Sequence, residues 1–101
     1  MVVSLIKIVW TKTAQDQLIE IYKYISQESA KNAIKVVNDL TKAVENIIQY
    51  PEKHKIDEYK RGNDGTYRAF EKHHFRVSYR NENQIIRILR IRHTKMSPKN
   101  Y

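Results

Sequence analysis

Arginine recurs at alternate positions through the last third of the chain, where strand-like stretches follow one another closely. The residues concerned are Arg68, Arg76, Arg80, Arg87, Arg90 and Arg92. Guanidinium groups bind phosphates through paired hydrogen bonds and stay charged at every relevant pH. Side chains two residues apart on a strand share a face, so Arg76 and Arg80 should point the same way, as should Arg90 and Arg92. The set predicts a cationic surface that binds phosphates, although any one of these arginines alone would suggest an ordinary solvated or edge position.

Two further side chains could move protons beside such a surface. His93 lies where the last predicted strand ends, between Arg92 and Lys95, and histidine titrates near neutral pH. The alternative is that His93 caps the strand end by hydrogen-bonding the backbone. Glu52 follows the second predicted helix and could act as a base near a cationic pocket, or it could be an ordinary loop charge. The sequence leaves these alternatives open.

Other kinds of catalytic centre lack their sequence signals. The chain has no cysteine, and no pair of histidines has the spacing of a zinc-binding helix. It also has no glycine-rich phosphate loop, and no serine is flanked by glycines as in a nucleophile elbow. We therefore expect neither a metal nor a cofactor.

Length and charge limit the class of protein. The chain has 101 residues, which predicts a single domain over residues 1–101. Its formal net charge is +8, and every arginine lies at or after Arg61. This excess favours a polyanionic partner, either nucleic acid or a strongly acidic protein, over a merely solvated basic surface. The apolar N-terminus is too short to span a bilayer and lacks the features of a signal peptide, so we expect a cytoplasmic protein with no membrane partner.

Caps, apolar spacing and turn residues predict the elements that position these side chains. A first strand is predicted over 5–10, followed by a helix from a cap at Thr11 or Thr13 to Gln27 and a second helix from a cap at Ser29 to Tyr50. A polar connector over 51–65 follows, with room for a short helical turn. The remaining strands are predicted over 67–72, 73–80 and 85–92, with a hairpin turn over 80–84. This β-α-α-β-β-β order predicts an α+β fold, in which a helical hairpin packs on one face of a small, mainly antiparallel four-stranded sheet. The other face stays open, and the alternating arginines supply the polar side chains that it needs.

The order of several short motifs resembles a known family. The motifs are Trp10-Thr-Lys-Thr-Ala14, Tyr50-Pro51-Glu52, Tyr67-Arg68-Ala69-Phe70, His74-Phe75-Arg76-Val77-Ser78-Tyr79-Arg80, and Ile88-Leu89-Arg90-Ile91-Arg92-His93-Thr94 with Pro98. Together they cover nearly the whole chain and resemble the RelE/ParE superfamily of type II toxin–antitoxin toxins, formerly grouped as plasmid stabilisation proteins. The resemblance implies a toxin with a compact α+β fold.

Two activities are implied by this resemblance. RelE-like and YoeB-like members cleave messenger RNA on the ribosome without a metal, by attack of the RNA 2′-hydroxyl on the adjacent phosphate. By resemblance to them, Arg76 would contact the scissile phosphate, with His93 and Glu52 as further catalytic residues. Their terminal tyrosine is replaced here by Thr94, and Tyr101 is a distant substitute. ParE-like members instead inhibit DNA gyrase and are not enzymes.

The sequence places ribosome-dependent RNA cleavage first, because a net charge of +8 suits ribosomal RNA. Gyrase inhibition is the alternative, and a nucleic-acid-binding module without toxicity is the third. We expect a cognate acidic antitoxin that neutralises the cationic face with a segment that folds on binding. The residues expected to bind nucleic acid or phosphate are Arg68, Arg80, Arg90, Arg92 and Lys95.

Overall fold

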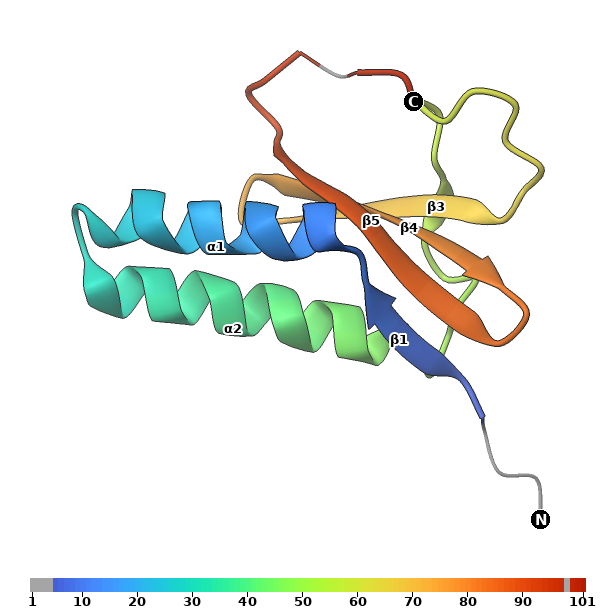
Figure 1. Ribbon diagram of the computed structural model, residues 1–101, viewed down its shortest axis with the longest axis horizontal. Coiled ribbons are helices and arrows are strands. Elements are labelled where there is room, and N and C mark those ends of the chain that lie inside the picture. The colour runs from blue at the N-terminus through green and yellow to red at the C-terminus, as the bar shows by residue number, and fades with distance from the viewer. Residues whose placement is uncertain (1–4, 98) are drawn as a thin grey trace.

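Two helices and five strands make up the computed structural model, which describes residues 5–97 and 99–101. The elements are β1 (Lys7–Trp10), α1 (Lys12–Ser26), α2 (Ala30–Asn46), β2 (Lys55–Ile56), β3 (Tyr67–Lys72), β4 (Phe75–Glu82) and β5 (Ile85–His93). They confirm the predicted α+β class and the helical hairpin, which Figure 1 shows beside the sheet. Pro98, the last residue of the family motifs, lies outside the described residues.

Side-chain caps begin both helices, as the sequence predicted. The Thr11 hydroxyl accepts a hydrogen bond from the Ala14 amide at 3.1 Å, and the same hydroxyl donates to the Leu89 carbonyl at 3.2 Å. Ser29 caps α2 by accepting from the Asn32 amide at 3.1 Å. Each cap satisfies an amide that the first helical turn leaves without a partner. Thr11 therefore also fixes the start of α1 against β5. Neither helix of the described chain is long and apolar enough to cross a bilayer.

The sheet has the strand order β1-β5-β4-β3-β2. β1 runs parallel to β5, and the other neighbours are antiparallel. The prediction of four strands was one short, because Lys55 and Ile56 pair with Ala69 and Arg68 as a two-residue strand. The connector therefore forms a short edge strand, whereas the sequence had left room for a short helical turn. Two residues carry no alternating pattern, so only the open edge of β3 determines that they pair.

Two-residue loops close both hairpins. His73 and His74 join β3 to β4 with φ of 52° and 67°, and Asn83 and Gln84 join β4 to β5 with φ of 54° and 62°. Positive φ at both central residues is the geometry that matches the twist of the adjoining strands. The prediction that His73 begins a strand was wrong, and the predicted turn over 80–84 is narrower than expected. His73 is fixed in its loop by a hydrogen bond of 2.6 Å from its Nε2 to Asp39 Oδ2 of α2.

A bulge in the β4–β5 ladder separates the apolar and cationic faces of the sheet. The register shifts between Ser78 and Tyr79, so that Ser78 pairs with Arg90 and Tyr79 with Ile88, which leaves Leu89 unpaired. The extra residue reverses the alternation along β5. The residues buried against the helices are Phe70, Phe75, Val77, Tyr79, Ile86, Ile88 and Ile91. The same shift places Arg90 and Arg92 on the opposite face, beside Arg76.

Gln84 provides a test of the loop geometry. At φ of 62° a side chain with a Cβ atom is strained, and glycine is not. We expect Gln84→Gly to raise the free energy of unfolding by about 0.5–1 kcal/mol, measured by urea denaturation. The control is Gln27→Gly at the end of α1, where φ is −59° and glycine should lower stability. Equal losses in both variants would contradict the assigned loop.

Candidate functional site

Four of the residues singled out from the sequence lie around one small cavity on the face opposite the helices. Its volume is about 120 Å³, and its lining consists of Tyr59, Glu71, Arg76, Arg90, Arg92, His93, Thr94 and Met96. Strand pairing explains the grouping, because Arg76 lies opposite Arg92 across the β4–β5 ladder and Ser78 opposite Arg90. We call this the arginine cavity. It brings Arg76, Arg90, Arg92 and His93 together, whereas alternation predicted only that Arg76 shares a face with Arg80 and Arg90 with Arg92.

Arg76 lines the cavity, and two carboxylates balance the charge of its guanidinium group. Its Nη2 lies 3.0 Å from Asp57 Oδ1, and its Nη1 lies 3.5 Å from Glu71 Oε2. The guanidinium also stacks over the Tyr59 ring at 4.8 Å, and only 20% of the side chain is exposed. Its buried Nε has no hydrogen-bond partner within the described part of the chain. Arg76 is therefore both a candidate phosphate contact and a structural ion-pair partner.

Asp57 is the residue that sequence reasoning missed. It is 1% exposed, and its Oδ2 accepts the Tyr101 hydroxyl at 2.5 Å while Oδ1 accepts the Tyr59 amide at 3.0 Å. Burial alone would raise the pKa of Asp57, but the hydrogen bonds from Tyr101, Tyr59 and Arg76 outweigh it, so the pKa lies below its usual value. No pattern near Asp57 signals this role, because its side-chain partners, Arg76 and Tyr101, are distant in sequence.

The C-terminal residues fold back over the cationic face. We call Ser97, Lys99, Asn100 and Tyr101 the tail, and Figure 1 shows the C-terminus next to the connector. Arg90 stacks over the Tyr101 ring at 4.0 Å and donates to the Lys99 carbonyl at 2.6 Å, while Arg92 donates to the Ser97 carbonyl at 3.2 Å. Burial, and then the hydrogen bond to Asp57, raise the pKa of Tyr101 far above its usual value. The face that was expected to be open is therefore partly covered.

His93 has the backbone contact that its alternative interpretation described. Its Nδ1 accepts a hydrogen bond from the Lys95 amide at 3.0 Å, which caps the end of β5. The ring packs edge-on against Phe75 at 5.1 Å and lies 6.4 Å from the His74 ring. An amide can only donate, so Nδ1 is the acceptor and a neutral His93 carries its proton on Nε2. The Lys95 side chain is exposed outside the arginine cavity.

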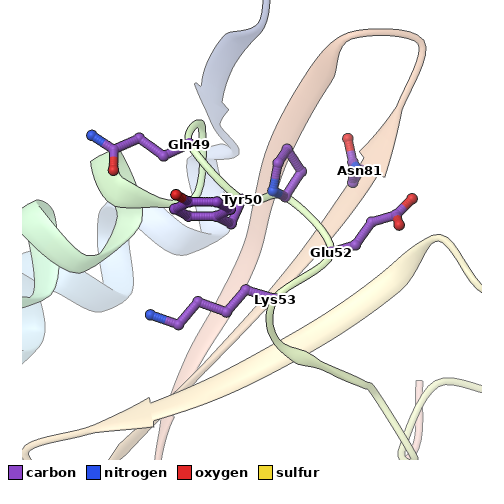
Figure 2. Close-up of a pocket in the computed structure, with 6 residues that line it drawn as sticks. Gln49, Tyr50, Glu52, Lys53 and Asn81 are labelled. Atoms are coloured by element: carbon purple, nitrogen blue, oxygen red, sulfur yellow. The ribbon is translucent and has the colours of Figure 1, made fainter.

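Glu52 and Arg68 lie apart from the arginine cavity. Glu52 lines a separate depression of about 660 Å³ after α2, together with Tyr50, Lys53 and Asn81, and Figure 2 shows its side chain directed away from that of Lys53. Arg68 donates to the Glu52 carbonyl at 3.2 Å and to the His54 carbonyl at 2.6 Å. Arg68 lies opposite the buried Tyr79 in the β3–β4 ladder, so its side chain leaves the sheet on the helix side. The structure therefore does not bring Glu52 and Arg68 together with Arg76.

Arg80 shares the face of Arg76 but is held in a network of its own. Its Nη2 lies 2.6 Å from Glu82 and 3.4 Å from Asp64, and its Nε donates to the Thr66 hydroxyl at 3.0 Å. These contacts hold the end of the connector to β4, and Arg80 does not line the arginine cavity. In the described part of the chain, no three histidine or carboxylate side chains are arranged to hold a metal ion.

Comparison with known proteins adds family information to this geometry. Residues 8–98 match the family described as the ParE toxin of the type II toxin–antitoxin system parDE. Among solved structures, the chain is similar to one from the chromosomal ParDE toxin–antitoxin system of P. aeruginosa. The identity is 23% and the TM-score 0.71, with 92% of this chain and 100% of that chain covered. At this identity the similarity shows a shared fold. No curated protein matches the sequence.

The buried Asp57 pair predicts a pH-dependent loss of stability. Its folded pKa is below the unfolded value of about 3.9, so ionised Asp57 stabilises the fold above that pH and loses this effect as the pH falls through the folded pKa. We expect Asp57→Asn to lower the free energy of unfolding by about 3 kcal/mol at pH 7, because Arg76 loses its buried partner.

Urea denaturation at pH 7 and in steps below pH 4 measures this effect, and the difference from the parent chain should shrink with acidity. Asp16→Asn is the matched control, since Asp16 is 57% exposed in a surface pair with Lys12 and should change stability by less than about 0.5 kcal/mol. A loss that is the same at every pH would assign the effect to packing instead.

Proposed function

Since this chain belongs to the ParE toxin family of type II toxin–antitoxin systems, we propose that it arrests growth by binding and inhibiting DNA gyrase, without itself being an enzyme. It is the toxin component of such a system, and its partner is a cognate antitoxin. The sequence alone placed RNA cleavage on the ribosome first. The geometry of the arginine cavity supports the opposite order.

The observation that carries this proposal is the ion pair between Arg76 and Asp57. A catalytic arginine must offer its charge to the phosphate as negative charge develops in the transition state. Here the Arg76 guanidinium faces Asp57 at 3.0 Å and Glu71 at 3.5 Å, so an incoming phosphate would compete with two carboxylates. A general base must also reach the proton that it removes, and Glu52 lines a different depression. These features favour a toxin that acts by binding.

Ribosome-dependent RNA cleavage is the second candidate, and one observation favours it. Arg76, Arg90, Arg92 and His93 line a cavity of about 120 Å³, which suits a single phosphate group. Proton transfer by His93 would need its imidazolium form, which gives the Nε2 proton to the leaving 5′-oxygen as the 2′-oxygen bonds to phosphorus, while water accepts the 2′-hydroxyl proton. The third alternative, a nucleic-acid-binding module without toxicity, is supported only by the net charge of +8.

The antitoxin is proposed to be acidic. A charge of +8 on a small domain repels itself and attracts an oppositely charged chain, which also raises the rate of association. An extended acidic segment could order on the cationic face as it binds, which is common for disordered partners.

Two assays run side by side test the proposal. We expect the purified protein to block supercoiling by DNA gyrase, and to leave no new 3′ ends on messenger RNA bound to purified ribosomes. New 3′ ends with unaffected supercoiling would overturn gyrase inhibition and establish RNA cleavage.

A histidine variant adds a second readout. If His93 only caps β5, His93→Asn should leave gyrase inhibition within about twofold of the parent. If it transfers protons to RNA, the same variant should lose about 10²–10⁴-fold in cleavage rate. His74→Asn is the matched control. His74 belongs to the β3–β4 loop, its ring lies 6.4 Å from the His93 ring, and its positive φ is one that asparagine adopts readily.

A further inference from the structure

We propose that the tail is a displaceable cover over a second surface, formed by Lys60, Arg90 and Arg92, that binds single-stranded nucleic acid. The proposal does not rest on gyrase inhibition. Arg90 and Arg92 line the arginine cavity and were expected from the sequence to bind nucleic acid, whereas Lys60 of the connector and the cover formed by the tail were not. The argument rests on how the tail contacts these cations, on how it is anchored, and on what its departure would expose.

The tail satisfies the hydrogen bonds of the two arginines without neutralising them. Arg90 donates to the Lys99 carbonyl and stacks on the Tyr101 ring, and Arg92 donates to the Ser97 carbonyl. Within residues 5–97 and 99–101, neither arginine forms an ion pair with a carboxylate. A phosphate would replace neutral acceptors with charged ones, and charge-assisted hydrogen bonds are the stronger kind. An anion therefore gains more from these arginines than the tail does.

The tail is anchored mainly through one residue. The Tyr101 hydroxyl donates to Asp57, the Tyr101 amide donates to the Tyr59 carbonyl at 2.9 Å, and the Arg61 amide donates to the Tyr101 main-chain oxygen at 2.6 Å. Ser97, Lys99 and Asn100 are exposed. A segment with exposed middle residues and one anchored end can leave as a unit when that end is released.

Departure of Tyr101 would free a cation and an aromatic surface as well. Lys60 Nζ donates to the Tyr101 main-chain oxygen at 3.2 Å and lies 5.3 Å above the Tyr101 ring. The Tyr67 ring packs edge-on against Tyr101 at 6.4 Å and would lose this neighbour. Lys60 Nζ and Arg80 Cζ lie 4.8 Å and 4.7 Å from the centroid of the Tyr67 ring, so a base could stack there once Lys60 turns toward a phosphate. Aromatic rings beside cations bind single strands, because bases stack on the rings while the cations follow the phosphates. Asp57 would keep Arg76 paired, so Lys60, Arg90 and Arg92 form the exposed surface.

The test measures binding of fluorescein-labelled 20-nucleotide RNA and DNA strands of one sequence by fluorescence anisotropy over a range of salt concentrations. Tyr101→Ala in the full chain removes the side-chain part of the anchor, which is the hydroxyl bond to Asp57 and the ring under Arg90, and Tyr101→Phe removes only the hydroxyl. We expect tighter binding for Tyr101→Ala, with a plot of log affinity against log salt steeper by about 2, since three released cations each contribute about 0.7. Tyr101→Phe should fall between this variant and the parent. Comparing the two strands shows whether one of them is preferred.

Two controls make the result decisive. Tyr50→Ala removes a tyrosine that is 67% exposed near Glu52, and it should bind like the parent. Adding Arg90→Gln and Arg92→Gln to Tyr101→Ala should remove the gain. Trypsin cleavage after Lys99 reports release of the tail, and in the parent chain the nucleic acid should accelerate it. Faster cleavage of Tyr101→Ala without tighter binding would overturn the proposal, as would parent cleavage that nucleic acid does not accelerate.

Discussion

The carboxylate of Asp57 joins three parts of the chain at one buried point. It accepts hydrogen bonds from Arg76 of β4, Tyr101 of the tail and the Tyr59 amide of the connector, and it is almost completely buried. A buried charge is tolerated only when its partners are in place, so each of the three segments depends on the other two. The long connector and the tail contain little apolar material, and this polar centre takes the place of a second core. By pairing with Arg76, Asp57 also lowers the net positive charge of the arginine cavity.

One extra residue, Leu89, gives the sheet an apolar face toward the helices and a cationic face on the other side. Without the bulge at Leu89, alternation along β5 would direct Ile91 away from the helices and Arg90 toward them. The bulge keeps Ile86, Ile88 and Ile91 in the core and Arg90 and Arg92 beside Arg76. The cationic face and the apolar core therefore come from the same strands, and a change in register would damage both.

Local signals in the sequence were enough to predict most of the fold. Thr11 and Ser29 cap the two helices as predicted, and the apolar spacing that follows them gave the α+β arrangement. The two-residue strand at Lys55 and the loop at His73 were missed, since each depends on a partner far along the chain. Alternation predicted that Arg90 and Arg92 share a face, but their grouping with Arg76 also depends on the bulge at Leu89, which was not predicted. The role of Asp57 was not predicted either, because a lone acidic residue in a polar connector has no distinguishing pattern. Glu52 was selected by motif position, and only the three-dimensional path of the connector places it elsewhere.

The parallel pairing of β1 with β5 determines when this chain can fold during its synthesis. The Thr11 amide donates to the Ile88 carbonyl and its hydroxyl to the Leu89 carbonyl, so the first described strand and the cap of the first helix find their partners in β5, the last of the described strands. Contacts between distant parts of a chain form late and slow the folding of the whole domain. The toxin domain consequently remains incomplete until nearly all of it has left the ribosome. A nascent chain interrupted before β5 would lack both its arginine cavity and the partner of its first strand.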